Sequence, residues 1–251
     1  MKPFLFITDL DYTLVGDDRA MAKLNEKLQQ HRLAYGTKIV YSTGRSLSLY
    51  KKLKAEKNLL EPDILVCSVG TEIYHQGSLI PDITWSQKLS SGWDRNLVLE
   101  ISKTFTDLKP QPPSELGDFK ISYFLTEEAA IKVLPELESC LLAQGLDIQV
   151  IYSGGKDLDI LPRNANKGMA MTFVRQSLDI DVAQTVASGD SGNDIALFEN
   201  RQEKGIIVGN ARPELLQWHQ QNPNPNRYLA QSEFAGGIEE GLVFFGFLGA
   251  I

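Results

Sequence analysis

The sequence has few of the residues that build disulfide frameworks or zinc sites. It contains 2 cysteines and 3 histidines among 251 residues, and none of them lies at a metal-ligand spacing from another. Cys67 lies in an apolar run and Cys140 lies in a helical pattern. We therefore expect both cysteines in the core of a protein from a reducing compartment, and we assign no catalytic role to the histidines.

Positive charge and long apolar runs are also scarce. Lys and Arg total 25 against 32 Asp and Glu, which gives a formal net charge of −7. Nucleic acids and anionic membranes are therefore not expected as partners. The apolar C-terminal stretch LVFFGFLGAI has about half of the roughly 20 residues that a membrane span needs, so we expect a final helix packed on a core. Carboxylates follow the N-terminus too early for a signal peptide, and a cytoplasmic protein is expected.

Short apolar runs alternate with helical patterns in the first and last parts of the chain. Such runs are typical of strands buried on both faces of a parallel sheet. We expect an α/β fold with a Rossmann-like, doubly wound parallel-sheet core formed by residues 1–81 and 160–251. The expected strands are 4–7, 38–42, 64–67, 184–188, 206–208 and 227–231, and the expected helices are 19–34, 46–58, 167–178, 194–201, 213–220 and one from 236.

The middle of the chain has a different pattern. Apolar and polar residues alternate in 119–125, 147–152 and 157–161, and residues 92–108 and 127–144 have helical patterns. Alternation indicates strands with one wet face, as in an antiparallel sheet covered by helices on its other side. We expect an inserted α+β domain at 82–159, in which the Pro-rich segment 109–113 is a loop.

Four polar motifs lie where a parallel sheet forms its site, at strand ends and helix starts. Each alone has an ordinary explanation, such as a surface DxD pair, a helix N-cap or a turn. Together they gather carboxylates at one edge, which costs stability unless a cation is bound. The motifs are Asp9-Leu-Asp11-Tyr-Thr13, Ser42-Thr43-Gly44-Arg45, Asn166-Lys167-Gly168 and Gly189-Asp190-Ser191-Gly192-Asn193-Asp194.

These residue types predict phosphoryl transfer. A carboxylate can attack phosphorus and form an aspartyl-phosphate, and Asp9 leads the first motif. Attack by an anion on an anion needs a divalent cation, and Mg²⁺ fits Asp9, Asp190 and a backbone carbonyl from Asp11. The Asp11 side chain then stays free as general acid to the leaving oxygen and as base to the hydrolytic water.

The remaining motif residues are expected to bind phosphate or to support the site. Thr43, the backbone at Gly44, Lys167 and Asn193 are the phosphate candidates, because hydroxyl, amide and ammonium groups stabilise phosphoryl oxygens. Asp194 is expected to orient Lys167 and metal-bound waters from outside.

In their order, the four motifs resemble those of the haloacid dehalogenase-like phosphatases. The resemblance is closer to the sucrose-phosphate phosphatases and covers nearly the whole chain. It includes the segments 69–77, 108–111, 120–125, 152–168 and 187–199. It implies a C2-type cap for the insertion, dependence on Mg²⁺, and hydrolysis of sucrose 6-phosphate to sucrose and phosphate. A monomer is expected, and association with a sucrose-phosphate synthase is left open.

The sugar is expected to lie under the inserted domain, where hydroxyl groups need convergent polar partners. Two alternatives stay open. One is a phosphatase for another sugar phosphate, such as mannosyl-3-phosphoglycerate or trehalose 6-phosphate. The other is a non-catalytic sugar-phosphate binding module, which the presence of all the motif aspartates disfavours. The sugar-contact candidates are Arg45, Glu72, Gln111, Lys120, Tyr123, Lys156 and Asp157. Lys120 and Tyr123 flank a strand with alternating faces, so both cannot point straight into one cleft.

Overall fold

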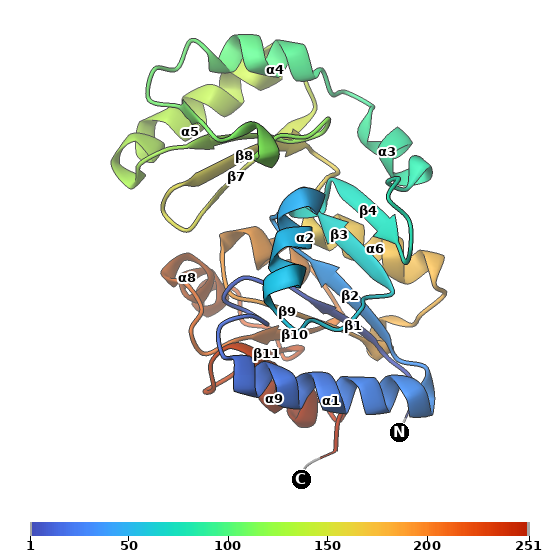
Figure 1. Ribbon diagram of the computed structural model, residues 1–251. Coiled ribbons are helices and arrows are strands. Elements are labelled where there is room, and N and C mark those ends of the chain that lie inside the picture. Colours follow the sequence, from blue (N-terminus) through green and yellow to red (C-terminus); the bar gives the residue numbers. More distant parts are fainter. Residues whose placement is uncertain (1, 250–251) are drawn as a thin grey trace.

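A computed structural model describes residues 2–249 and contains two β-sheets, each covered by helices (Figure 1). The large sheet has seven strands in the order β11-β10-β9-β1-β2-β3-β4, and the small sheet has four in the order β5-β6-β8-β7. The α/β fold with a mostly parallel central sheet is therefore confirmed.

The large sheet reverses its strand order at its centre. From β1 the chain moves outward through β2, β3 and β4, and it later returns to β9 on the other side of β1. Open α/β sheets bind ligands at such a reversal, beyond the carboxyl ends of the strands. The parallel strands are β1 (Leu5–Thr8), β2 (Lys38–Ser42), β3 (Ile64–Cys67), β9 (Thr185–Gly189), β10 (Lys204–Ile207) and β11 (Arg227–Leu229), and β4 (Glu72–His75) pairs antiparallel to β3.

Helices cover both faces of the large sheet. Phe4 and Phe6 belong to the hydrophobic cluster on one face, whereas Leu5 and Ile7 belong to the cluster on the other. This alternation explains why the strand is apolar at every position. The first face carries α1 (Asp18–Tyr35), α2 (Leu47–Glu56) and α9 (Phe234–Phe244), and the second carries α3 (Ile83–Leu89), α6 (Lys167–Ser177), α7 (Ile195–Phe198) and α8 (Pro213–Gln221).

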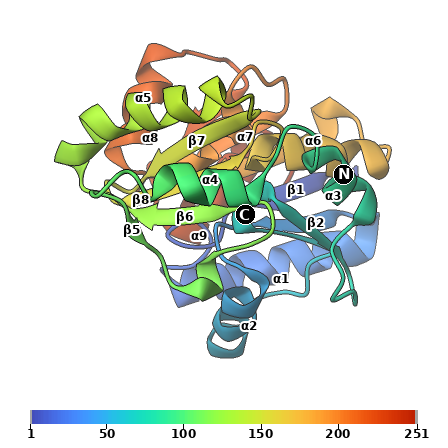
Figure 2. The same ribbon diagram turned by 90° about the horizontal axis from the view of Figure 1, so that it is seen from above.

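The small sheet is antiparallel and has helices on one face only. Figure 2 shows α4 (Arg95–Ser102) and α5 (Glu127–Ala143) lying over its strands. The other face is turned toward the carboxyl ends of the large sheet (Figure 1). Its strands are β5 (Lys109–Pro110), β6 (Ile121–Phe124), β7 (Ile148–Ser153) and β8 (Asp157–Pro162). Short 3-10 turns are η1 (Ser68–Gly70), η2 (Pro113–Glu115), η3 (Val182–Gln184) and η4 (Gly192–Asp194).

Three elements of the middle region differ from the sequence-based expectation. The helical segment of 92–108 is confined to α4, and the unexpected helix α3 precedes it. Trp85 and Leu89 of α3 pack in a cluster of the large sheet, and the Trp85 indole donates to the carbonyl of Gly70 at 3.0 Å. At the other end β8 continues to Pro162. The expected limits of the insertion, 82 and 159, thus fall before α3 and within β8.

The Pro-rich segment and one cysteine also depart from expectation. Lys109 and Pro110 form the edge strand β5 rather than a loop, a place where proline costs no ladder hydrogen bond. Cys140 is exposed, because it lies off the buried stripe of α5, whereas Cys67 is buried as expected. Within residues 2–249 no helix is both long enough and apolar enough to cross a membrane.

Candidate active site

A polar cavity of about 390 Å³ lies between the carboxyl ends of the large sheet and the open face of the small sheet. Residues from both sheets line it. The large-sheet side supplies Asp9, Asp11, Tyr12, Gly44, Arg45, Asp190, Ser191, Asn193 and Arg212, and the small-sheet side supplies Gln111, Pro112, Glu115, Lys120, Phe124, Ser153, Gly154, Lys156, Asp157 and Asp159.

A cluster of three buried carboxylates lies at the floor of the cavity: Asp9 and Asp190 line it, and Asp194 lies beneath them. One oxygen from each lies within 4.8 Å of the others. Asp9 directly follows β1 and Asp190 directly follows β9. These strands are adjacent and parallel, and the N–H of Asp9 donates to the carbonyl of Ser188 at 3.0 Å. The pairing of two fully buried strands therefore brings carboxylates 181 residues apart in sequence to one edge.

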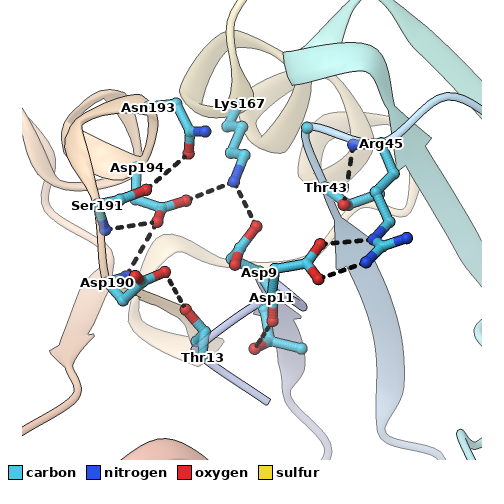
Figure 3. Close-up of polar contacts among 12 residues, drawn as sticks. Asp9, Asp11, Thr13, Thr43, Arg45, Lys167, Asp190, Ser191, Asn193 and Asp194 are labelled. Atoms are coloured by element: carbon cyan, nitrogen blue, oxygen red, sulfur yellow. Dashed lines mark hydrogen bonds and ion pairs between the residues drawn. The ribbon is translucent and has the colours of Figure 1, made fainter. Parts of the chain in front are cut away.

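Lys167 connects two of these carboxylates. Its Nζ lies 2.6 Å from Asp9 Oδ1 and 2.6 Å from Asp194 Oδ1, and its side chain is fully buried (Figure 3). Burial alone lowers the pKa of Lys167, but the ion pairs with Asp194 and Asp9 raise it above its usual value. A Cβ on Gly168 would lie 1.8 Å from the carbonyl of Ala196, so only glycine lets α6 come this close.

Asp194 is held by the loop that carries Asp190. Its Oδ2 accepts hydrogen bonds from the backbone N–H groups of Asp190 at 2.9 Å and Ser191 at 3.1 Å. Both of its oxygens are thus occupied, one by the loop and one by Lys167. Asp194 therefore links the loop that carries Asp190 to Lys167.

The cluster fits a divalent cation by the chemistry of its donors. Lys167 occupies one oxygen of Asp9 and the Thr13 hydroxyl occupies one oxygen of Asp190 at 2.9 Å. Among residues 2–249 no donor binds the second oxygen of either carboxylate (Figure 3). Burial and the neighbouring carboxylates raise the pKa of Asp9 well above its usual value, although Lys167 opposes this. Burial, and next the charge of Asp194, raise the pKa of Asp190 to about 7. Hard oxygen ligands with uncompensated negative charge suit Mg²⁺.

Asp190→Asn is expected to raise the thermal stability of the metal-free protein at pH 8. An acid whose pKa is raised by folding loses stability as the pH rises from its unfolded value near 4 toward 7. Removing the charge restores that stability, by roughly 2–8 °C in melting temperature, the shift that about 1–2 kcal/mol gives in a chain of this size. Melting curves in chelator are the measurement.

Mg²⁺ provides the matched comparison for this variant. Addition of Mg²⁺ is expected to stabilise the unsubstituted protein and to leave Asp190→Asn nearly unchanged, because the variant lacks one of the candidate ligand carboxylates. At pH 4 the two proteins are expected to melt together, since Asp190 is then protonated. An Asp190→Asn protein that is less stable at pH 8 and still responds to Mg²⁺ contradicts the proposed site.

Asp11 points away from this cluster and is not free. Its two carboxylate oxygens accept hydrogen bonds from Arg45 Nε and Nη2, both at 2.7 Å (Figure 3). The Asp11 side chain, expected to act as general acid and base, is thus paired with Arg45 in this structure. Arg45, expected among the sugar contacts, does line the cavity, but its guanidinium is engaged with Asp11.

The expected phosphate-binding residues lie at different depths. Gly44 and Asn193 line the cavity. Thr43 is fully buried, and its Oγ1 accepts the N–H of Arg45 at 3.1 Å, which fixes the turn before α2. Lys167 lies below the cavity wall, behind Asp9.

The expected sugar contacts divide into two groups. Gln111, Lys120, Lys156 and Asp157 line the cavity together with Arg45. Tyr123 does not, because its side chain is buried in the hydrophobic cluster between the small sheet and its helices.

Glu72 also lies outside the cavity lining. Its Oε2 accepts the hydroxyl of Tyr74 at 2.8 Å. The structure therefore does not bring Tyr123 and Glu72 into the cavity with the other sugar candidates.

Several cavity residues were not expected from the sequence, among them Tyr12, Glu115, Asp159 and Arg212. Asp159 is two residues from Asp157 on β8, so the period of the strand could have indicated it. Its Oδ1 accepts the Ser122 hydroxyl at 2.6 Å and lies 3.5 Å from Lys120 Nζ. Arg212 lies over the ring of Tyr12, 4.9 Å from the ring centroid, and no local signal joins residues so far apart.

Comparison with known proteins identifies the family. A family model described as sucrose-6F-phosphate phosphohydrolase matches residues 2–246. The probable sucrose-phosphatase 2 of Arabidopsis thaliana is 39% identical over 250 residues, which cover 96% of this chain and 59% of that protein. The chain thus spans less than two thirds of that relative. The mannosylfructose-phosphate phosphatase of Agrobacterium fabrum is 34% identical and is covered to 98%, as is this chain.

A solved structure is similar over the whole chain. It is a sucrose-phosphatase from Synechocystis in complex with sucrose and phosphate, with a TM-score of 0.92, 41% sequence identity and 100% coverage of both chains. The chain belongs to the sucrose-6F-phosphate phosphohydrolase family, within the haloacid dehalogenase-like superfamily.

Proposed function

We propose that this protein hydrolyses sucrose 6-phosphate to sucrose and inorganic phosphate. One observation carries the proposal: a single cavity has the carboxylate cluster on its floor and polar side chains of the small sheet on its roof. A phosphate on the floor and an uncharged sugar under the roof fit this division. The likeness to the Synechocystis enzyme with bound sucrose and phosphate supports it.

Asp9 is the proposed nucleophile. Its carboxylate attacks phosphorus, the sugar oxygen departs, and the phosphoryl group remains as an aspartyl-phosphate. Lys167 keeps this carboxylate oriented through its 2.6 Å contact. Mg²⁺, held by Asp9, Asp190 and a backbone carbonyl of Asp11, would lower the repulsion between the carboxylate and the phosphate.

Asp11 is the proposed general acid and base. It protonates the departing sugar oxygen and then removes a proton from the water that hydrolyses the aspartyl-phosphate. Both tasks require at least one oxygen of Asp11 to leave Arg45, to which both are bonded. Gly44, Asn193, Thr43 and Lys167 are proposed to hold the phosphoryl oxygens as negative charge moves during transfer.

The small sheet with α4 and α5 is proposed to act as a substrate-binding cap. We place the cap at residues 90–162, between the end of α3 and the end of β8. Its face toward the cavity carries Glu115, Asp157, Asp159, Lys120 and Gln111. Gln111 Nε2 donates to Asp157 Oδ1 at 3.0 Å. Such a network offers donors and acceptors to sugar hydroxyl groups and rejects a wrong sugar by leaving polar groups unpaired.

Phosphate release from a panel of sugar phosphates tests the proposed substrate. Sucrose 6-phosphate is expected to be turned over fastest, with activity lost in chelator and restored by Mg²⁺. Mannosylfructose phosphate is a second candidate, because the Agrobacterium relative matches along nearly the whole of both chains. Trehalose 6-phosphate and mannosyl-3-phosphoglycerate complete the panel. Faster turnover of any of these three than of sucrose 6-phosphate contradicts the proposal.

Lys120→Met is expected to raise KM for sucrose 6-phosphate by about tenfold or more, the usual loss when a charged hydrogen bond to a ligand is removed. Lys120 is almost fully buried at the cavity, 3.4 Å from the carbonyl of Gly44 and 3.5 Å from Asp159. Steady-state kinetics with sucrose 6-phosphate and with p-nitrophenyl phosphate, which has no sugar, provide the measurement.

Tyr123→Phe is the matched control for this prediction. Tyr123 is on β6, three residues after Lys120, but it packs in the cluster under α4 and α5. The KM of the Tyr123→Phe variant for sucrose 6-phosphate is expected to be unchanged. A rise in KM for Tyr123→Phe equal to that for Lys120→Met would mean that both act through the stability of the small sheet, and sugar binding by Lys120 would be refuted.

A further inference from the structure

We infer that Glu214 is a clasp that holds the cap hairpin against the loop carrying Asp190, and that it thereby positions the sugar-binding wall over the phosphate site. Glu214 lies in the first turn of α8, outside the four sequence motifs. Its Oε1 accepts the N–H of Gly154, in the turn between β7 and β8, at 3.0 Å. The same oxygen accepts the N–H of Gly192, in η4, at 3.4 Å.

The two amides belong to opposite walls of the cavity. Ser153, Gly154, Lys156 and Asp157 of the hairpin line it from the cap. Ser191, Asn193 and Asp190, on either side of Gly192, line it from the large sheet. One carboxylate oxygen therefore joins both walls at the edge of the cavity. A carboxylate in the first turn of a helix stabilises that helix through its dipole. This stabilisation needs no hydrogen bonds to residues outside the helix, so it does not explain the two contacts of Glu214.

The clasp lies on the side where a hinged cap would open. The chain enters the cap through its first residues, 90–94, before α4, and leaves it through residues 163–166, after β8. Both lie on the side of α3 and α6, whereas the β7–β8 hairpin extends to α8 on the opposite side (Figure 1). When a domain rotates about a hinge, the parts far from the hinge move most, so a contact there restrains opening most strongly.

The local backbone is shaped for this close approach. Gly154 and Gly155 both have positive φ, 60° and 67°, a conformation that favours glycine and forms tight hairpin turns. A Cβ on Gly192 would lie 3.1 Å from the carbonyl of Tyr152 and 3.2 Å from Glu214 Cγ. Glycine at these positions lets the hairpin, η4 and Glu214 meet.

Amide hydrogen exchange tests whether Glu214 holds the two loops together, and this test does not depend on the proposed function. The effect of Glu214 on catalysis does rest on the proposed function. In the substrate-free protein, Glu214→Ala is expected to speed exchange at Gly154 and Gly192 by at least about tenfold, because a charge-assisted acceptor is lost. Glu214→Gln keeps an acceptor oxygen and is expected to stay within about threefold of the unsubstituted protein. Glu128→Ala, which removes an exposed first-turn carboxylate of α5, is expected to change neither amide.

Steady-state kinetics then test whether Glu214 positions the sugar-binding wall of the cap. In Glu214→Ala, kcat/KM for sucrose 6-phosphate is expected to fall about tenfold more than that for p-nitrophenyl phosphate, mainly through KM, because only the sugar ester uses the cap wall. Unchanged exchange at both glycines overturns the clasp, as does a Glu214→Gln protein that behaves like Glu214→Ala. Equal losses for the two esters, with faster exchange, would reduce Glu214 to a structural contact and overturn its positioning role. If the unsubstituted protein fails to hydrolyse sucrose 6-phosphate, the proposed function fails while the exchange result still decides the clasp.

Discussion

Asp9→Asn is expected to lower kcat for sucrose 6-phosphate by at least about 10⁴-fold, the scale seen when a catalytic nucleophile is removed. An amide is a poor nucleophile, so the covalent step is lost. The fold is expected to persist, because an asparagine oxygen can still accept the hydrogen bond from Lys167 that Asp9 accepts at 2.6 Å. Burial and neighbouring carboxylates already raise the pKa of Asp9, so a neutral side chain relieves repulsion.

Steady-state kinetics and a melting curve measure these two expectations separately. Asp18→Asn is the matched control, because Asp18 is an exposed aspartate of α1 that pairs with Lys57, and neither residue lines the cavity. That variant is expected to keep full activity. An Asp9→Asn protein that retains more than about one hundredth of the activity would exclude a route through an aspartyl-phosphate on Asp9.

Asp11→Asn is expected to lower kcat for sucrose 6-phosphate by about 10²–10⁴-fold, the usual contribution of a general acid–base. The effect should depend on the leaving group. p-Nitrophenolate departs without protonation, so with p-nitrophenyl phosphate the first step is expected to remain fast. Hydrolysis of the aspartyl-phosphate still lacks its base, and a burst of nitrophenolate followed by slow turnover is therefore expected in rapid-mixing experiments.

Arg45→Met distinguishes the role of the Asp11 carboxylate from the role of its ion pair with Arg45. Arg45 binds both oxygens of Asp11 at 2.7 Å, but the acid itself remains in the variant. Its kcat is expected to fall by less than about tenfold, since general acid–base catalysis is retained. The assignment of Asp11 does not survive if Asp11→Asn loses less than Arg45→Met, or if p-nitrophenyl phosphate gives no burst.

The periodic pattern of apolar residues in the sequence predicts much of the fold. The strand before Asp9 and the strand before Asp190 are short, apolar throughout and buried on both faces, so their positions and the edge at which they meet follow from pattern alone. The seven-residue α3 and the two-residue β5 are too short for a period to develop. Sequence periodicity alone therefore does not reveal these two elements.

The site was harder to predict where partners are distant in sequence. Alternation along β6 and the residue before it puts Lys120 and Tyr123 on opposite faces, but the face that meets the cavity depends on where α4 and α5 pack, which local sequence does not decide. Arg45 pairs with Asp11 across 34 residues, and Glu214 meets Gly154 across 60. No local preference encodes such contacts.

Trapping of the covalent intermediate tests the central claim most directly. The protein is mixed with sucrose 6-phosphate and Mg²⁺, quenched in acid within a turnover and treated with borohydride, which reduces an acyl phosphate to an alcohol. Peptide mass spectrometry is expected to find homoserine at position 9, and to find none when Mg²⁺ is chelated. Turnover with aspartate intact at position 9 in every quenched sample, or a modification at another carboxylate, would contradict the account.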